Sequence, residues 1–357
     1  MGLETILAVV LLVSLTFYAL LGGADFGAGV WHLLSHGSSR RDQHRLIGEA
    51  IGPIWEANHV WLILVITILF TAFPSVYARI AISLHLPLTL LVLGIVLRGA
   101  AFAFRHYDVK DDEIHLRWDQ LFSVSSLISP LLLGTILGAV TVGHFPINPE
   151  GFWDGYVSPW LKPFPLIMGF FTLILFAYLA AVYLLLDTSD LLLQDIFRRR
   201  AILAALIAGL LEESVLILGQ TSAPRLWGEL TNSLWGRGFQ LAVGSLTIAA
   251  IWFLITKRYW WARSCAILQV TLTVWAWGIA QFPYLVPPYL TVFNASAPEV
   301  TLRFITVTLG LGALLLFPSL WYLFRIFKGE FWGNKEEVMD RPPDRVSTVL
   351  PDQLEKP

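Results

Sequence analysis

Three ionisable residues lie inside long apolar stretches of the sequence: Asp25, Glu56 and Arg98. A charge at the centre of a bilayer costs about 2.5–3.5 kcal/mol on insertion scales, so each of these residues has to be paired, hydrated or neutral. Each lies roughly seven to nine residues from the predicted cytoplasmic end of its stretch. At 1.5 Å of rise per residue, the three are therefore at a similar depth in the membrane. Because helices joined by short loops are usually neighbours, we expect them to form one buried cluster.

A fourth carboxylate, Glu49, precedes Glu56 by seven residues. Residues i and i+7 of a continuous helix face the same side, which predicts a ladder of acids leading from water toward the middle of the membrane. Groups that bind and release protons can form a proton route, and Glu49, Glu56 and Asp25 are its predicted members. The alternative for Asp25 and Arg98 is a static ion cluster that fixes helix packing, with Arg98 as the charge partner of the acids.

The histidines raise the question of haem, because His59 and His85 lie within apolar stretches and two buried histidines can ligate a haem b. A hydrogen-bonded histidine in a polar seam is the favoured interpretation. The others lie near stretch ends or in loops: His32, His36, His44, His106, His115 and His144. The single cysteine, Cys265, excludes a disulfide framework and a Cys-rich metal site. We predict no metal site in this chain.

Two further patterns concern packing and charge. Gly23 and Gly27 form a small-xxx-small pair around Asp25, which lets two helices approach closely. Glu212 and Glu213 form an acidic pair in a later apolar stretch. Only one of two adjacent helical residues can easily face a given direction, so the sequence assigns this pair no role.

The elements that must position these residues follow from composition. The chain has 357 residues, of which 56% are hydrophobic and only 14% charged, and its mean hydropathy is +0.67. Ordinary soluble domains carry about 25% charged residues. A formal net charge of -2 provides no field to gather nucleic acid. The composition therefore predicts an integral membrane protein.

Nine stretches are long enough to cross a bilayer as helices, which takes about 20 apolar residues. They are roughly 3–34, 47–72, 76–104, 121–142, 163–186, 201–218, 239–256, 262–282 and 301–327. We therefore expect an all-α membrane protein with a single transmembrane domain over residues 1–328. Residues 329–357 are polar and proline-containing, and they predict a disordered cytoplasmic tail.

The distribution of basic residues predicts the orientation. With the N-terminus outside and the C-terminus inside, 18 of the 24 Lys and Arg residues lie on the inner side and 5 on the outer side, Arg98 being the remaining one. Such a bias marks the cytoplasmic loops of membrane proteins.

Several motifs resemble subunit II of cytochrome bd-type quinol oxidases. They are GADFG at 23–27, GPIWEANHVWLI at 52–63, FTAFPSVYA at 70–78, FPYLVP at 282–287 and residues 294–302. The resemblance covers the membrane core from end to end, with no recognised signature between about 186 and 239.

The resemblance implies a non-haem subunit of a heterodimeric oxidase in the prokaryotic plasma membrane. Its partner, subunit I, would hold two b-type haems and one d-type haem, and the complex would oxidise quinol and reduce dioxygen to water with protons taken from the cytoplasm. Glu56 stands where the family has an acid associated with proton delivery, and Asp25 and Arg98 also match family positions. A quinone is possible near Trp55 and His59, and no other cofactor is expected in this chain.

Two alternatives from other classes remain open at this stage. A secondary transporter for protons or a small cation could use the same intramembrane acids, although the chain shows no obvious inverted repeat. A self-sufficient dihaem cytochrome would require haem in the isolated chain. A visible spectrum of the chain purified with and without its partner separates the three possibilities.

Overall fold

A computed structural model describes residues 2–52, 55–107, 112–146 and 150–328. The chain divides into two compact units, Met1–Leu311 and Gly312–Pro357. The boundary falls within the last helix, and the single transmembrane domain over residues 1–328 stays a prediction. The tail predicted to be disordered, residues 329–357, lies outside the described residues. Apart from the end of α14 (Glu299–Lys328), the helices and the sites described below belong to the first unit.

The described residues are almost entirely helical. The first apolar stretch is one run of helix made of α1 (Leu3–Phe17), a π-helical turn η1 (Tyr18–Gly22) and α2 (Gly23–Leu33). The other helices are α3 (Arg40–Ile51), α4 (Trp55–Asn58), α5 (Val60–Ala72), α6 (Pro74–Ser83), α7 (His85–Tyr107), α8 (Asp112–Val142), α9 (Pro163–Leu184), α10 (Leu191–Ser222), α11 (Pro224–Asn232), α12 (Leu234–Ile255), α13 (Tyr259–Gln281) and α14 (Glu299–Lys328). A second π-helical turn, η2 (Trp153–Val157), and a short antiparallel pair, β1 (Tyr284–Val286) with β2 (Leu290–Thr291), lie in the connecting segments.

Eight helical segments within the described residues are long and apolar enough to cross a membrane. They correspond to eight of the nine predicted stretches, and the chain is an all-α integral membrane protein. The ninth predicted stretch, 262–282, forms the 23-residue helix α13. Arg263, Gln269 and Gln281 lower the apolar character of α13, which is therefore not among the eight.

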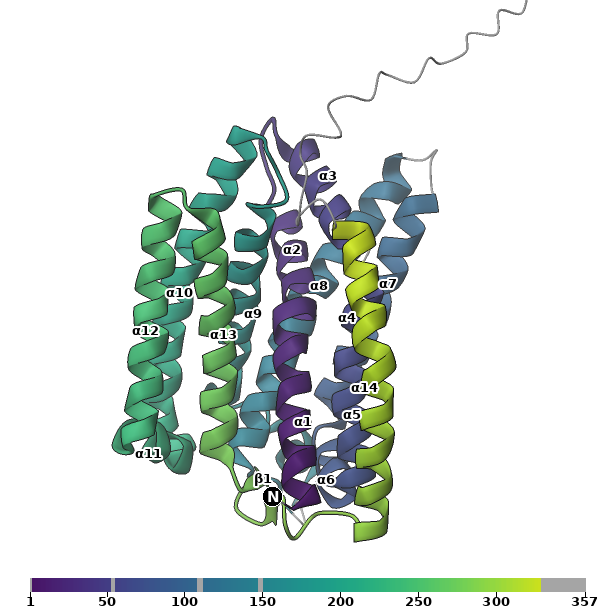
Figure 1. The fold of residues 1–357 in the computed structure, drawn as a ribbon, viewed down its shortest axis with the longest axis vertical. Coiled ribbons are helices and arrows are strands. Elements are labelled where there is room, and N and C mark those ends of the chain that lie inside the picture. Colours follow the sequence, from purple (N-terminus) through teal and green to yellow (C-terminus); the bar gives the residue numbers. More distant parts are fainter. Residues whose placement is uncertain (1, 53–54, 108–111, 147–149, 329–357) are drawn as a thin grey trace, which may run out of the picture. The chain divides into compact units, whose positions relative to one another are not determined.

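Helix α9 lies at the centre of the first unit. It packs against α2, α8, α10 and α13, and 72% of its most apolar segment is buried. Figure 1 shows α10, α12 and α13 on one side of α9 and α2, and α4, α5 and α7 on the other side. The first run of helix therefore stands between two groups of helices, with Asp25 in its last third, near the start of α2.

Glycines allow α2 to lie directly against α9, as the small-xxx-small pattern predicts. A Cβ atom at Gly27 would overlap the main-chain carbonyl of Phe176, and one at Gly23 would meet the ring of the same residue. One turn beyond Gly27, the indole Nε1 of Trp31 donates a hydrogen bond of 2.7 Å to the main-chain oxygen of Ala177. The close approach and this buried hydrogen bond fix the position of α2.

The second apolar stretch is not the continuous helix that its hydropathy predicts. Helix α3 ends at Ile51, α4 is a four-residue helix, and α5 begins at Val60. Residues 53 and 54, between α3 and α4, lie outside the described residues. Glu49 and Glu56 therefore lie on different helices, and the prediction that both face the same side of one helix is wrong.

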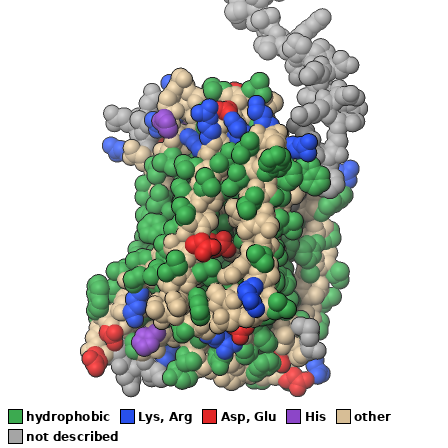
Figure 2. Space-filling view, turned by 90° about the vertical axis from the view of Figure 1, so that its left-hand side faces the viewer, with side chains coloured by type: hydrophobic (Ala, Val, Ile, Leu, Met, Phe, Trp, Pro, Cys, Tyr) green, Lys and Arg blue, Asp and Glu red, His purple; other side chains and the backbone are tan. Residues whose placement is uncertain are grey.

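The surface has the character expected of a membrane protein. Figure 2 shows hydrophobic side chains over the middle of one face and charged side chains toward its two ends, with a group of acidic side chains interrupting the hydrophobic middle. Exposed apolar residues such as Leu210, Ile217, Leu241 and Ile248 are 68–73% exposed, which suits contact with lipid.

Replacing Gly27 by Ala tests the close approach of α2 and α9. We expect Gly27→Ala to destabilise the protein by about 1–3 kcal/mol or more, because the obstructing atoms belong to the main chain of Phe176 and cannot move aside. Gly244→Ala is the matched control, since no atom lies within 4 Å of its added Cβ. Thermal unfolding of the purified variants, followed by tryptophan fluorescence, measures the difference. Equal unfolding temperatures would contradict the contact.

Candidate functional site

The site is organised around Arg98, which is only 2% exposed although it lies within the predicted span of α7. Its Nε donates to the hydroxyl of Ser126 at 3.0 Å, and its Nη2 donates to the main-chain oxygen of Asp25 at 2.9 Å. The guanidinium carbon lies 4.7 Å from the centre of the Phe26 ring and 5.2 Å from that of Phe122. Hydrogen bonds and two aromatic faces replace the water that the cation has lost.

The Asp25 side chain is buried beside this cation, at 6% exposure. The amide Nδ2 of Asn58 donates to its Oδ2 at 2.7 Å. Asn58 is itself 2% exposed and is the last residue of the short helix α4. Arg98 and Asp25 therefore lie in one buried group with Asn58 and Ser126, in which α2, α4, α7 and α8 each contribute a polar side chain.

Glu56 is not part of this buried group, although its depth predicted that it would be. Its side chain is exposed, and the described residues provide it with no hydrogen-bond or ion-pair partner. Residues two positions apart on a helix diverge by about 200°, so Asn58 and Glu56 point to opposite sides of α4. The amide of Asn58 faces the interior of the protein, and the carboxylate of Glu56 faces its surface.

Glu49 lies on the surface of α3. It accepts a hydrogen bond of 2.8 Å from Arg45 Nε, and the two side chains are 64% and 79% exposed. Arg45 and Glu49 form an i,i+4 pair, and exposed pairs of this kind contribute little to stability. Glu49 is therefore accessible and does not contact Asp25 or Arg98.

His59 lies between α4 and α5 in an aromatic pocket. The centre of its ring is 6.1 Å from those of Tyr18 and Phe26 and 6.2 Å from that of Trp55. Its Nδ1 is buried and has no hydrogen-bond partner among the described residues. The rings of Tyr18, Phe26 and Trp55 therefore form an aromatic wall around a histidine that has one buried polar atom.

His85 lies elsewhere. It is exposed at the start of α7, where its Nδ1 is 3.0 Å from the main-chain oxygen of Ile82 and its ring packs edge-on against Tyr156. His59 and His85 thus have entirely different neighbours. The arrangement does not support their joint ligation of a haem.

Sequence reasoning missed Asn58, Ser126, Phe26 and Phe122 as partners of the buried charges. Asn58 and Ser126 are polar residues within apolar stretches, so the sequence could have marked them as partners of the buried charges. The prediction considered only ionisable residues. Phe26 and Phe122 gave no such signal, because aromatic residues are abundant throughout the chain. Their contact with Arg98 depends on which faces of α2 and α8 are turned toward α7.

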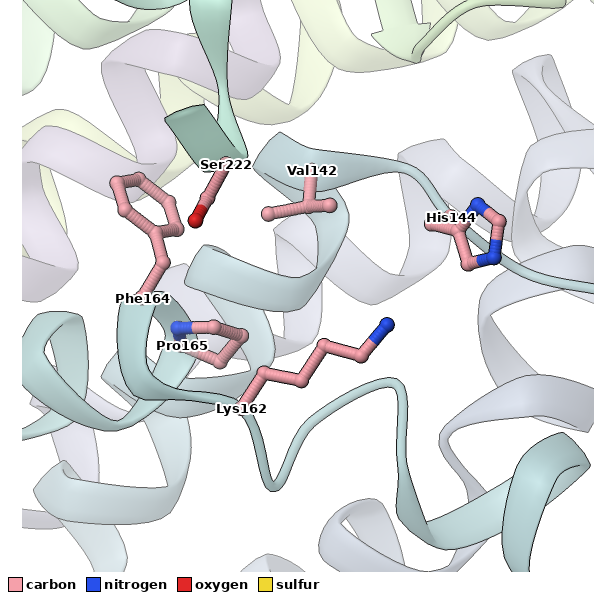
Figure 3. A pocket seen from close by; sticks show the side chains of 6 residues that line it. All are labelled: Val142, His144, Lys162, Phe164, Pro165 and Ser222. Carbon is pink, nitrogen blue, oxygen red and sulfur yellow. The ribbon is translucent and has the colours of Figure 1, made fainter. Parts of the chain in front are cut away.

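A separate pocket lies away from this site, where α8 ends, α9 begins and α10 ends. It has a volume of about 370 Å³ and is lined by Val142, His144, Lys162, Phe164, Pro165 and Ser222. In Figure 3 the Lys162 side chain extends along the pocket toward Val142 and His144. None of the predicted site residues lines it.

The acidic pair of α10 also lies away from the site. Glu213 is exposed and Glu212 is partly buried. Neither contacts Asp25, Glu56 or Arg98. Within the part of the chain that the structure describes, no partner explains the pair.

Comparison with known proteins gives consistent matches along the whole chain. The family model for cytochrome bd terminal oxidase subunit II matches residues 3–327. Cytochrome bd ubiquinol oxidase subunit 2 of Bacillus subtilis is 30% identical over 341 residues, which cover 90% of this chain and 94% of the relative. Cytochrome bd-I ubiquinol oxidase subunit 2 of Escherichia coli K12 is 25% identical over 354 residues, covering 88% and 92%.

A solved structure supports the same fold. A chain of the bd oxidase from Geobacillus thermodenitrificans superposes with a TM-score of 0.71, at 24% sequence identity. The match covers 92% of this chain and 99% of the other. The fold described above is therefore that of a chain in this solved structure.

Substitutions at Arg98 test the buried group. Removing one member of a buried charged set costs about 3–5 kcal/mol, so we expect Arg98→Leu to reduce the yield and the unfolding temperature of the purified protein severely. Arg98→Lys keeps the charge but cannot donate to Ser126 and Asp25 in the same fork, so it should be intermediate.

Arg303→Leu is the control, because Arg303 forms an exposed pair with Glu299 at 2.9 Å that should contribute no more than about 1 kcal/mol. Yield and unfolding temperature are compared for all variants. Values like those of the unchanged protein in both Arg98 variants would show that the charge is not a structural requirement.

Proposed function

The chain belongs to the cytochrome bd terminal oxidase subunit II family, and we propose that it is the non-haem subunit that delivers cytoplasmic protons to a haem-bearing partner. Membership makes it a multi-pass prokaryotic membrane protein and a subunit of a quinol-oxidising enzyme complex. Reduction of dioxygen to water consumes protons as well as electrons. A subunit without redox chemistry of its own can contribute by carrying those protons.

The observation that carries this proposal is the exposure of Glu56 inside an apolar segment. A carboxylate facing lipid at this depth is costly, and intramembrane ionisable residues nearly always face other protein or a water-filled cavity. Glu56 faces away from the interior of its own chain. We therefore assign the surface around it to the partner subunit, with Glu56 presented at that boundary.

The residues that follow Glu56 support a protein contact. Ile63, Ile66 and Phe70 of α5 are 61%, 45% and 60% exposed. Ile66 and Phe70 lie three and seven residues after Ile63, which is the spacing of one face of α5, and Glu56 precedes them on α4. An acid at the head of an exposed apolar stripe suits assembly against another helix bundle and shields the acid from lipid.

Glu49 is the proposed entry to the route. It is exposed on α3, a helix rich in charged residues that precedes the apolar part of this stretch. Protons would pass from Glu49 to Glu56 along the outer side of α3 and α4, with the partner completing the path. General acid–base groups have to be within reach of a donor and an acceptor, and water can bridge them.

Asp25 was predicted on the same route, and its contacts favour a positioning role. Its carboxylate accepts from Asn58 on the inner side of α4. Because Asn58 is held inward, Glu56 two residues earlier is directed outward. Asp25 and Arg98 thus keep the short helix in the orientation that the proton route needs.

The proposal also covers where the haems and a quinone would bind. We propose that the haems b and d belong to subunit I, since His59 and His85 lie in different surroundings. A quinone bound near Trp55 and His59 would be held by the aromatic wall and the buried Nδ1 described above. The proposed proton route does not depend on whether this quinone is bound.

Paired substitutions at Glu56 test the proton route. Gln keeps the size of the side chain but cannot titrate, whereas Asp titrates and is shorter by one methylene group. We expect Glu56→Asp to retain substantial quinol-driven oxygen uptake per haem d and Glu56→Gln to lose most of it, with haem content preserved in both.

Glu213→Gln is the matched control, since Glu213 is also an exposed acid within an apolar helix. It should leave oxygen uptake unchanged. Full activity in Glu56→Gln would give Glu56 a purely structural role. Loss of haem in Glu56→Gln would instead mean that the complex had failed to assemble, and it would contradict the expected preservation of haem.

A further inference from the structure

Three metal-ligating side chains converge at one end of the helices, away from the Arg98 group. His32 is the seventh residue after Asp25 on α2, His44 belongs to α3, and Asp119 belongs to α8. Their ligand atoms all lie within 4.8 Å of one another. The distance is 3.8 Å from His32 Nε2 to Asp119 Oδ1 and 3.7 Å from His44 Nδ1 to Asp119 Oδ2. The side chains of His32, His44 and Asp119 are only 2%, 12% and 16% exposed.

Hydrogen bonds of the outer ring nitrogens determine which nitrogen of each imidazole carries the proton. The Ser123 hydroxyl donates to the main-chain oxygen of Asp119 at 2.8 Å, so it has to accept from His32 Nδ1, which is 2.9 Å away. His44 Nε2 lies 3.2 Å from the main-chain oxygen of His32, and a carbonyl can only accept. In the neutral rings, His32 Nε2 and His44 Nδ1 therefore carry lone pairs, and both are on the side of Asp119.

Two ring nitrogens with lone pairs and a carboxylate gathered within 4.8 Å of one another can attract a cation. The nitrogen–oxygen distances are longer than the 2.7–3.2 Å of a hydrogen bond. They are close to the roughly 3.3 Å that separates two ligand atoms on one tetrahedral zinc ion with bonds of about 2.0–2.1 Å. Metal-bound histidines usually donate their second ring N–H to an oxygen acceptor, as His32 and His44 do here.

Two protonated imidazoles are the competing explanation. The rings of His32 and His44 are stacked with their centres 3.5 Å apart and an interplanar angle of 22°. Two positive charges at that separation repel each other, which disfavours double protonation. Ligation by both nitrogens requires a rotation of the His44 ring out of the stack, and His44 is the more accessible of the two.

We propose that His32, His44 and Asp119 bind one divalent transition-metal ion, for which Zn²⁺ best matches two imidazoles and a carboxylate. Water would complete the coordination. The ion would join α2, α3 and α8 at this end of the molecule. This proposal differs from the sequence-based expectation of no metal site, and it is independent of the proposed proton route.

Zinc content tests the proposal. The purified oxidase complex containing this chain is treated with a chelator, equilibrated with zinc chloride, freed of loosely bound metal and measured by mass spectrometry. We expect about one zinc per chain in the unchanged protein and in His36→Gln, a control at an exposed histidine nearby. His44→Gln and Asp119→Asn should lose that zinc. Equal zinc in all four proteins, or none retained in the unchanged one, overturns the proposal.

Two further readouts keep the test decisive if a variant assembles poorly. Zinc should raise the unfolding temperature of the unchanged complex and of His36→Gln, because a ligand that binds only the folded state stabilises it. X-ray absorption at the zinc edge should show nitrogen and oxygen ligands at about 2.0–2.1 Å with imidazole scattering. A hydrated or sulfur-ligated zinc would mean adventitious binding only.

Discussion

Burial of the Arg98 guanidinium is the constraint on which the rest of the site depends. The cation is 2% exposed and has to exchange water for protein partners. It finds them on two other helices: the main-chain oxygen of Asp25 on α2 and the hydroxyl of Ser126 on α8, with Phe26 and Phe122 on either side. Three helices therefore have to hold one relative position for the charge to be tolerated.

The neighbouring features follow from that requirement. Helix α2 can supply Asp25 only because Gly27 allows it to lie on the main chain of α9. The Asp25 carboxylate then accepts from Asn58, which holds the short helix α4 with Glu56 directed outward. A buried charged group that fixes helix packing thus leads to an acid at the protein surface. Under the proposed function, the static and proton-conducting interpretations of these residues are complementary, with Arg98 and Asp25 in the first role and Glu56 in the second.

Hydropathy and motif patterns predicted the membrane class, the helical stretches and the family, because long apolar runs and the GPIWEANHVWLI segment are local properties of the chain. The joint placement of Arg98 and Asp25 followed from depth alone. Depth could not predict that Glu56 faces outward, since the side on which a residue lies depends on where a helix is interrupted. The His32–His44–Asp119 group was missed for a related reason: its members lie on three helices with no characteristic spacing, and only tertiary packing brings them together.

Proton uptake during a single turnover tests the central claim most directly. The fully reduced complex is mixed with dioxygen in a weakly buffered solution containing a pH indicator, and haem oxidation is followed in parallel. Delivery through Glu56 requires that Glu56→Gln still binds dioxygen and begins to oxidise its haems, while proton uptake from solution becomes much slower than in the unchanged enzyme. Proton uptake at an unchanged rate in Glu56→Gln would contradict the account.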